Sequence, residues 1–356
     1  MTRAAGRRVL VLGHSAARTG APIALLHLLR WLRHHTDLDC DLVLARDGPL
    51  ADEYRRVCTV FIAPPLGRTA RVRAVVDRVR WPWRNGPHRP ARLADLAQRD
   101  FGLIFANTVT NGHALRWLSP LALPVVCHAH EVRTHFQALA RRHPDWLCTR
   151  ADAYIAVTQE TAACLMQHGV AAERMTQVPG FVDVGAAPLR DPAQRRLIRQ
   201  QHGIPEDANV VGACGTIQRQ KGPDLFVRVA RAVAARPGAR KVHFVWIGGR
   251  RGDAGMVRLQ WDILRFNLSA RVAVIPSLTD PAAVFQSLDM FALTSRNDPL
   301  PLVALEAGLH GLPVICFAGN AELVDGDRGR VVPYLDVGAF AEAVLELAAD
   351  ETLRTT

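Results

Sequence analysis

Short apolar runs alternate along most of the chain with segments in which apolar residues recur at helical spacing. Such runs are typical of strands that are buried on both faces of a parallel sheet, and the helical segments are typical of the connections between them. We therefore expect an α/β protein. The expected strands are residues 8–12, 42–45, 101–106, 124–128, 151–157, 209–214, 242–247, 271–276, 290–293 and 313–317.

The clearest example of this alternation lies between residues 290 and 317. Pro299 and Pro301 follow the first strand and suit the first turn of a helix, where a missing N–H costs nothing. Gly311 is typical of the position just after a helix, and the next apolar run follows it. One face of the expected helix carries Leu302, Leu305 and Leu309. The segment therefore predicts a helix that connects two buried strands.

The start of this helix predicts a phosphate site. Free backbone N–H groups at a helix N-terminus favour an anion at the carboxyl edge of a parallel sheet. Asp298 and Glu306 are eight positions apart, at the helix start and about two turns later. A carboxylate repels a bound phosphate, so Glu306 is better suited to hydroxyl groups such as a ribose diol. The residues expected at the phosphate are Pro299, Leu300, Pro301 and Leu302.

This segment resembles the acidic signature of the family 4 glycosyltransferases of the GT-B fold. That signature usually has two glutamates separated by seven residues, followed by A-x-x-x-G-x-P-V. Here Asp298 stands in the first place and Glu306 in the second, and Gly311 and Pro313 keep the spacing. The resemblance implies two Rossmann-like domains that face each other across a cleft. The alternative is an ordinary strand–helix–strand crossover with an exposed acidic turn.

A second loop, G-T-I-Q-R-Q-K-G at residues 215–222, resembles the family's G-R-x-x-x-x-K-G, whose Arg and Lys hold the donor diphosphate. Lys221 matches the lysine, whereas Thr216 occupies the arginine position and Arg219 follows three residues later. Only two of the 44 basic residues are lysines, Lys221 and Lys241, so a lysine here indicates a need for a compact ammonium group. The resemblance implies donor contacts for Thr216, Arg219 and Lys221, and a chance surface lysine is the alternative.

The loop after the first expected strand differs from a dinucleotide-binding loop. Gly13 and Gly20 are seven positions apart with no glycine between them, which is not the G-x-G-x-x-G pattern. An NAD-dependent oxidoreductase is therefore disfavoured. The family has a glycine pair before its first helix, near the donor phosphate and the acceptor, and Gly20 with Ala21 matches this place. A simple strand–helix turn is the alternative.

Two polar groups follow central strands of the first half. Asn107 comes directly after one strand, where such sheets bind ligands, and C-H-A-H-E ends the next. The family has a His-Asp or His-Glu pair here, so His130 with Glu131 implies a contact to the sugar near its anomeric carbon, and His128 is a weaker candidate. Cys127, His128 and His130 have the ligand types of a zinc site, but no further cysteine pair supports one.

Charged segments in the first half allow further interpretations. The stretch D-L-D-C-D at Asp37–Asp41 resembles the D-x-D metal motif of the other large glycosyltransferase fold, but we expect it in a solvated turn without a metal. Residues 68–92 hold eight arginines and one aspartate, with valines at near-helical spacing followed by Trp81 and Trp83. This segment is either an amphipathic element that contacts an anionic membrane or a lipid-linked acceptor, or a solvated helix. No recognised module indicates nucleic acid as a partner.

The composition indicates a globular protein with two domains, because 356 residues exceed one usual core. We expect an N-terminal acceptor domain at residues 1–182, a linker and lead-in helix at 183–207, and a donor domain at 208–356. The C-terminal crossover helices usual in the family look short or missing. No run of about 18 apolar residues predicts a membrane helix, and the first apolar run is too short for a secretory signal. Seven scattered cysteines suit a reducing cytoplasm.

The resemblance implies a retaining glycosyltransferase that moves a sugar from a nucleotide diphosphate sugar to a glycan, lipid-linked or small-molecule acceptor. Lys221, Arg219 and the helix N-terminus would neutralise the diphosphate, Glu306 would hold the ribose, and Asp298 the donor sugar. No metal or other cofactor is then needed. The alternative is a non-catalytic sugar-nucleotide-binding relative, motivated by Thr216, Asp298 and the short C-terminus. The sequence does not indicate the oligomeric state. The candidate catalytic residues are His130, Asp298 and Glu306.

Overall fold

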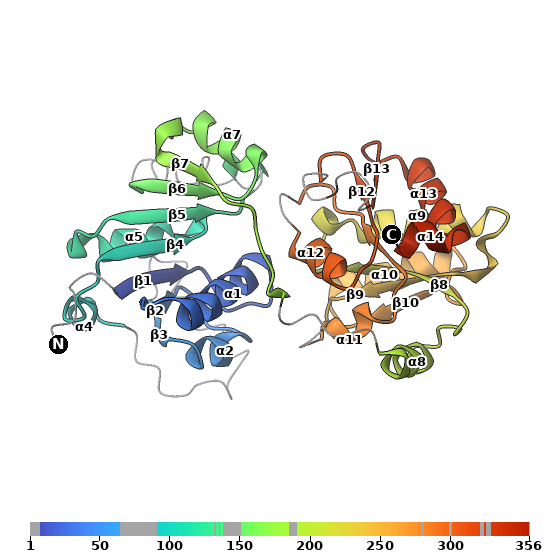
Figure 1. Ribbon diagram of the computed structural model, residues 1–356, viewed down its shortest axis with the longest axis horizontal. Coiled ribbons are helices and arrows are strands. Elements are labelled where there is room, and N and C mark those ends of the chain that lie inside the picture. Colours follow the sequence, from blue (N-terminus) through green and yellow to red (C-terminus); the bar gives the residue numbers. More distant parts are fainter. Residues whose placement is uncertain are drawn as a thin grey trace. The chain divides into compact units, whose positions relative to one another are not determined.

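The computed structural model describes residues 8–64, 91–131, 133–134, 136–137, 151–184, 191–278, 281–298, 301–320, 324 and 329–355. The chain divides into two compact units, Met1–Gly180 and Phe181–Thr356, and each contains one parallel sheet flanked by helices (Figure 1). The predicted α/β class is confirmed. Among the described residues, no helix combines the length and the apolar character that are needed to span a bilayer.

The N-terminal unit has a seven-stranded sheet in the order β3-β2-β1-β4-β5-β6-β7 (Figure 1). Because β1 pairs with β2 on one side and with β4 on the other, the strand order reverses between β1 and β4, which is where open parallel sheets bind ligands. The strands are β1 (Arg8–Gly13), β2 (Asp39–Leu44), β3 (Thr59–Ile62), β4 (Leu103–Asn107), β5 (Val125–Ala129), β6 (Ala153–Ala156) and β7 (Met175–Gln177). The helices are α1 (Gly20–His35), α2 (Ala51–Arg55), α4 (Leu93–Ala97), α5 (Gly112–Leu118) and α7 (Gln159–Gln167).

The C-terminal unit has a six-stranded sheet in the order β10-β9-β8-β11-β12-β13. Its order reverses between β8 and β11, so the loops after these two strands meet at one place. The strands are β8 (Asn209–Cys214), β9 (Val242–Ile247), β10 (Val272–Ile275), β11 (Met290–Leu293), β12 (Val314–Phe317) and β13 (Gly329–Val332). The helices are α8 (Pro192–Gln201), α9 (Pro223–Ala234), α10 (Ala254–Arg265), α11 (Ala282–Phe285), α12 (Leu302–Leu309), α13 (Val337–Ala349) and α14 (Glu351–Thr355).

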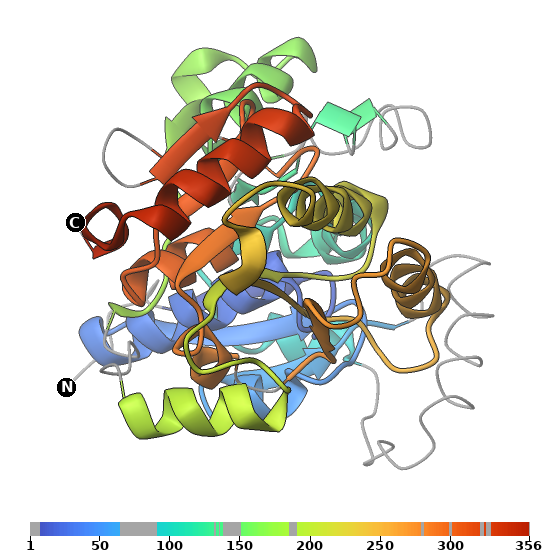
Figure 2. The same cartoon turned by 90° about the vertical axis from the view of Figure 1, so that its right-hand side faces the viewer.

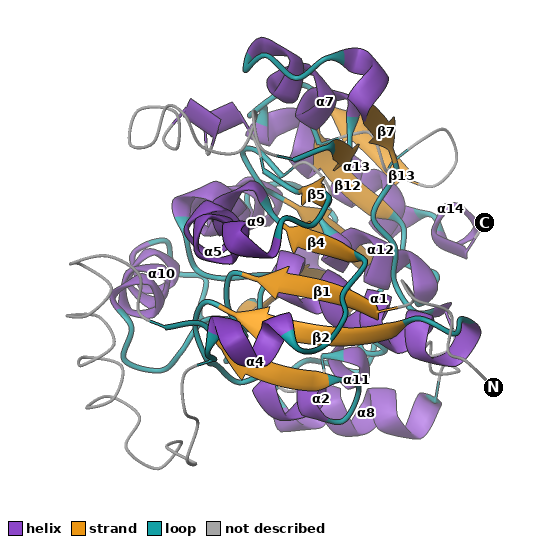
Figure 3. Cartoon of the chain, turned by 90° about the vertical axis from the view of Figure 1, so that its left-hand side faces the viewer, coloured by secondary structure: helices purple, strands orange, loops and turns teal. Residues whose placement is uncertain are grey.

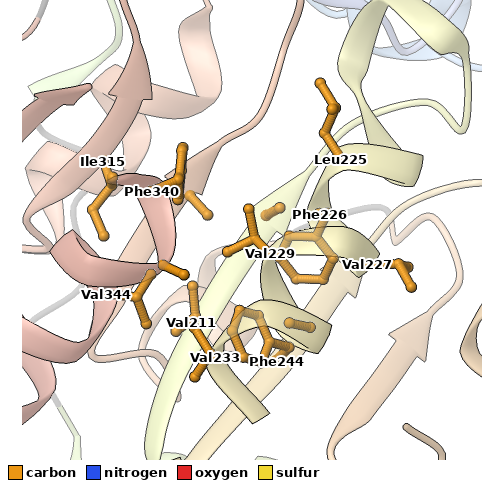
Figure 4. Packing of buried hydrophobic residues seen from close by; sticks show 14 of the residues in the cluster. Val211, Leu225, Phe226, Val227, Val229, Val233, Phe244, Ile315, Phe340 and Val344 are labelled. Carbon is orange, nitrogen blue, oxygen red and sulfur yellow. The ribbon is translucent and has the colours of Figure 1, made fainter. Parts of the chain in front are cut away.

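The C-terminal sheet is buried on both faces, which explains its continuous apolar runs. Along β8, Val211 packs into one hydrophobic cluster and Val210 into another. In the first cluster, α9 and α13 cover the sheet (Figure 2). The Phe226 ring makes edge contacts with Phe244 and Trp246, at 5.5 and 5.4 Å between centroids, and Figure 4 shows Phe226 beside Phe244. This burial of both faces makes the sheet a firm support for the loops at its carboxyl edge.

One local prediction is wrong in its second half. The sequence D-L-D-C-D was expected to form a solvated turn, and Asp37 and Leu38 are exposed before β2, but the strand begins at Asp39, and the Asp41 side chain is buried within it. The Arg99 guanidinium donates to the Asp41 carboxylate at 2.9 Å, and this ion pair allows an acidic residue to be part of a buried strand. Most of the basic segment 68–92 lies outside the described residues.

Candidate functional site

In the C-terminal unit, the loop after β8 is held tightly against the loop after β11. Gly222 has a φ of +69°, and a Cβ at this position would lie 1.9 Å from the carbonyl oxygen of Thr294. The Thr294 hydroxyl donates to the Gly222 carbonyl oxygen at 3.1 Å. Only glycine allows both the positive φ and this close approach, so Gly222 fixes the position of the lysine before it.

Lys221 forms an ion pair with Asp298, so the structure brings these two predicted residues together. The same carboxylate oxygen accepts a hydrogen bond from the Ser295 hydroxyl at 3.2 Å. Asn320 completes the network, because its side-chain oxygen accepts the Asp298 N–H at 2.8 Å and its amide donates to the Ser295 carbonyl oxygen at 2.8 Å. Asp298, Ser295 and Asn320 are all buried, so the loop presents the Lys221 ammonium from a fully hydrogen-bonded support.

A second ion pair fastens the same two loops. Arg296 donates two hydrogen bonds to the Asp224 carboxylate, at 2.8 and 2.6 Å, and one at 2.8 Å to the Arg219 carbonyl oxygen. Burial alone would raise the pKa of Asp224, but the hydrogen bonds and charge of Arg296 hold this pKa below its ordinary value. The Arg219 side chain is exposed, and Thr216 is half-buried.

Glu306 lies on α12 and is half-buried. Burial raises the pKa of the Cys214 thiol to about 12, with a further rise from Glu306 and an opposing effect of Lys221. Glu306 and Lys221 therefore both lie near the end of β8, where Cys214 is the last residue.

The helix start differs slightly from the prediction. Pro301 is the N-cap residue of α12 and Leu302 its first residue, so Asp298 precedes the helix rather than opening it. The first turn of α12 carries no acidic side chain, and its N-cap residue, Pro301, makes no side-chain capping bond. This arrangement suits an anion. The predicted phosphate contacts Pro299 and Leu300 lie outside the described residues.

In the N-terminal unit, Asn107 connects His130 to the start of α1. The Asn107 amide donates to the Ala21 carbonyl oxygen at 3.0 Å, so its side-chain oxygen faces the Nε2 atom of His130, at 2.9 Å. With an acceptor at this position, the neutral His130 ring carries its proton on Nε2. Burial, with the neighbouring His128 and His14, lowers the pKa of His130 well below its ordinary value.

Glu131 is buried beneath this histidine. Its carboxylate accepts the N–H groups of Val109 and His130 at 3.2 and 3.0 Å, yet burial outweighs these bonds and raises the pKa of Glu131 to about 7. Burial lowers the pKa of His128 to about 4, and burial and Arg46 lower that of His14 to about 4. The three histidines are therefore neutral at pH 7.

The predicted glycine position is open. Gly20 is the first residue of α1, and a Cβ there would meet no atom within 4 Å. Thr19 is the N-cap residue and makes no side-chain capping bond. Thr19 therefore leaves the N–H groups that begin α1 uncapped, and Gly20 adds no side chain at this position.

Two family profiles match the chain, Glycosyltransferase Family 4 over residues 18–186 and Glycosyl transferases group 1 over residues 208–350. The chain belongs to the family 4 glycosyltransferases. A curated relative is the D-inositol 3-phosphate glycosyltransferase of Mycobacterium tuberculosis, which is 35% identical over 205 residues. That match covers 54% of this chain and only 40% of the relative's length.

Solved structures show the same fold. The structure of HepE from Anabaena in complex with UDP and glucose has a TM-score of 0.75 at 22% identity, and the match covers 98% of this chain and 91% of HepE. WaaG, a glycosyltransferase of lipopolysaccharide biosynthesis, has a TM-score of 0.70 at 16% identity, with 98% and 92% coverage. The predicted GT-B fold is confirmed.

Two possible metal sites were considered from the sequence, one at Cys127, His128 and His130 and one at the D-L-D-C-D stretch. Neither forms among the described residues. Cys127 belongs to the hydrophobic core, and His128, its neighbour on β5, points to the opposite face of the strand. Asp39 and Asp41 each pair with an arginine, Arg8 and Arg99. No group of three His, Cys, Asp or Glu side chains in this part of the chain is placed to hold a metal ion.

Sequence reasoning missed the residues that support the site. Arg296 and Asp224 are 72 positions apart, and Ser295 and Asn320 are 25 apart, so no local pattern joins them. In the sequence, only their position next to recognised motifs could have indicated these residues: Asp224 follows Lys-Gly-Pro, and Arg296 lies between β11 and Asp298.

Proposed function

We propose that the protein is a retaining glycosyltransferase that transfers a sugar from a nucleotide diphosphate sugar to an acceptor. The observation that carries this proposal is the Lys221–Asp298 pair at the carboxyl ends of β8 and β11, with Glu306 near the same place. Family membership and the structural likeness to HepE, whose structure contains UDP and glucose, support a nucleotide sugar as the donor.

The C-terminal unit would bind the donor. Lys221, the first turn of α12 and the exposed Arg219 would neutralise the diphosphate as it leaves, and Glu306 would hold the ribose. Asp298 would orient Lys221 and contact the donor sugar through its carboxylate. Because these cations and N–H groups carry the phosphate charge, we expect turnover to persist when divalent metals are chelated with EDTA.

The N-terminal unit would supply the group that faces the reacting sugar. Asn107 holds the His130 ring so that Nε2 carries the proton and Nδ1 has the lone pair. A neutral imidazole with a fixed lone pair accepts a hydrogen bond from a sugar hydroxyl without adding charge next to the departing diphosphate. The acceptor would be a glycan, a lipid-linked sugar or a small molecule.

A calorimetric screen against UDP, GDP, ADP, dTDP and CMP, with NAD as a control, tests donor binding. We expect one nucleoside diphosphate to bind, and Glu306→Gln to weaken it because the amide no longer accepts two ribose hydroxyl bonds. Normal affinity in Glu306→Gln would place the ribose elsewhere. If none of the nucleotides binds, the proposal is wrong.

A second candidate is a non-catalytic relative that binds nucleotide sugars. It is favoured by Thr216, which stands where the family has an arginine for the diphosphate. Turnover separates the two candidates: the enzyme releases nucleoside diphosphate from its sugar donor when acceptor is present, and the non-catalytic relative binds the donor without releasing it. For an active enzyme, the anomeric configuration of the product, measured by NMR, tests the retaining mechanism.

A further inference from the structure

Helix α10 of the C-terminal unit has apolar side chains on two opposite sides. One side packs into the unit through Met256, Leu259 and Ile263, which are buried. The other side exposes three large apolar residues: Val257 is 47% exposed, Trp261 67% and Leu264 64%. Among the described residues, Trp261 and Leu264 are two of the most exposed large apolar side chains, and they lie on one helix.

The three exposed residues form a single stripe. They are spaced i, i+4 and i+7, so at about 100° per residue they fall within an arc of roughly 60°, and they span about 10 Å along the helix axis. The buried residues of α10 lie on the other side of the helix, so packing against the rest of the unit does not explain the stripe. Figure 3 labels α10.

Arginines border this stripe. Arg258 and Arg265 follow Val257 and Leu264 directly in sequence and lie along one edge of the stripe, and both are exposed. Arg250 and Arg251 precede the helix and are also exposed. Asp253 and Asp262 are the acidic residues of this segment, so arginines outnumber them by four to two.

We propose that this face of α10, defined by Val257, Trp261, Leu264, Arg258 and Arg265, docks on an anionic lipid surface. Tryptophan is favoured at the boundary between headgroups and acyl chains, and the two aliphatic residues add apolar area beside it. The arginine side chains can reach the headgroup phosphates while their stems lie along the apolar boundary. The proposal does not depend on the catalytic assignment.

A second copy of the chain fits this face less well. A stable interface buries about 800 Å² on each partner, which is much more than three side chains on one short helix provide. Two copies related by symmetry would also bring Arg258 and Arg265 close to the same arginines of the other copy, and like charges repel. An anionic surface neutralises these charges instead.

Co-sedimentation with vesicles tests the proposal on the full chain. One set of vesicles is neutral phosphatidylcholine, and the other also contains phosphatidylglycerol. We expect binding to the anionic vesicles only, weakened by high salt, and at least tenfold weaker in the double variant Trp261→Glu with Leu264→Glu. Both side chains are exposed, so the melting temperature should stay close to that of the wild type.

A matched control is Trp31→Glu, because Trp31 is also a tryptophan on a helix surface, 52% exposed on α1. It should bind anionic vesicles as the wild type does. Equal binding to both vesicle types, or no binding, overturns the proposal. Undiminished binding of the double variant also overturns it and assigns the contact to another surface, such as residues 68–92. A dimer in light scattering that the double variant abolishes would identify the occupant as a second copy and overturn the lipid assignment.

Discussion

The candidate sites of the two units differ in their electrostatics: the site of the C-terminal unit is charged, and that of the N-terminal unit is neutral. In the C-terminal unit, two ion pairs, Lys221–Asp298 and Arg296–Asp224, hold charged groups in fixed places. In the N-terminal unit, burial removes charge: it lowers the pKa of the histidines and raises that of Glu131 to about 7. Both sites stand at the carboxyl ends of strands where the order of a parallel sheet reverses, so the same scaffold supports opposite chemistry.

The difference indicates what each site is suited to meet. A diphosphate needs compensating charge, and an ammonium held by a buried carboxylate is already oriented when the anion arrives. Sugar hydroxyls need directed hydrogen bonds, which a neutral imidazole and an amide provide at a lower desolvation cost than ions. Single substitutions in the two units should therefore have different kinds of effect.

The largest expected effect is on the charged site. Lys221→Ala should weaken donor binding by ~1.5–3 kcal/mol, the range of a hydrogen bond to a charged group, which is roughly 10- to 150-fold in Kd. Lys241→Ala is the matched control, because Lys241 is exposed and pairs with the equally exposed Asp207. Titration calorimetry with the nucleotide that binds wild type provides the measurement. Equal affinities of the two variants would remove Lys221 from the donor site.

The next effect concerns the buried carboxyl of the neutral site. Because the folded-state pKa of Glu131 is about 7 and its ordinary value is 4.5, the folded protein keeps a proton that the unfolded chain releases between these values. The stability that Glu131 contributes is therefore lost as the pH rises through this window. The amide of Glu131→Gln does not titrate, so its stability relative to wild type should increase from pH 5 to pH 8, on the order of 2 kcal/mol.

The comparison with wild type is needed because His14 and His128 act in the opposite direction. Their pKa values are lowered to about 4, so the unfolded chain binds more protons up to about pH 6.5 and stability rises with pH there. Denaturant unfolding of both proteins at several pH values cancels this shared contribution. A difference that stays constant with pH would show that Glu131 is ionised at pH 5 in the folded protein.

A smaller effect is expected from breaking the Arg296–Asp224 ion pair, which fastens the two loops of the charged site. Asp224→Asn leaves Arg296 without its carboxylate and loosens the contact of Arg296 with the Arg219 carbonyl oxygen. The pair is partly exposed, so we expect a loss of ~1 kcal/mol in unfolding free energy and a severalfold weaker donor affinity. Asp207→Asn breaks the exposed pair with Lys241 and should leave the donor affinity unchanged. If both variants bind donor normally, the Arg296–Asp224 pair is not a support of the site.

The sequence predicted the central strands of both sheets and the edge strand β10, but it missed the edge strands β3, β7 and β13. Strands such as β8, β9 and β12 are buried on both faces, so their apolar runs are continuous and easily recognised. In the N-terminal unit, β3 and β7 are edge strands with partly exposed residues, and neither was predicted. The apolar pattern of an edge strand is less distinct, because such a strand has a neighbouring strand on one side only, and water reaches its other side.

Residues of the candidate sites could be predicted from the sequence only where the residue type or its place after a strand was recognisable by itself. Lys221 stood out because lysine is rare in this chain, and His130 because it follows a buried strand. The pairing of Lys221 with Asp298 spans 77 positions, so it depends on how β8 and β11 lie together in the sheet. Asn107 was recognised by its place after a strand, but its bond to His130 requires the neighbouring pairing of β4 with β5.

The substitution with the smallest expected change in energy is also the most direct test of the neutral site of the N-terminal unit, which contains Asn107 and His130. Asn107→Ala removes the acceptor that keeps the His130 proton on Nε2, so the ring should become a mixture of its two neutral forms. Long-range ¹H–¹⁵N spectra of histidine-labelled protein distinguish the two ring nitrogens, and a His130→Gln variant assigns the signal. An unchanged Nε2–H form in Asn107→Ala would show that another group orients the ring.

Asn107→Asp sharpens the same test. A carboxylate at this position accepts the same Nε2 proton but also favours the charged ring, so the pKa of His130 should rise relative to wild type. The groups that oppose this rise are His128 and His14, together with burial. If Asn107 orients the ring for a sugar, Asn107→Asp should retain donor affinity yet lose turnover as the pH falls and His130 becomes protonated, because a charged ring has no lone pair to accept a hydroxyl. Turnover with the wild-type pH profile would separate the orientation of His130 from its proposed role.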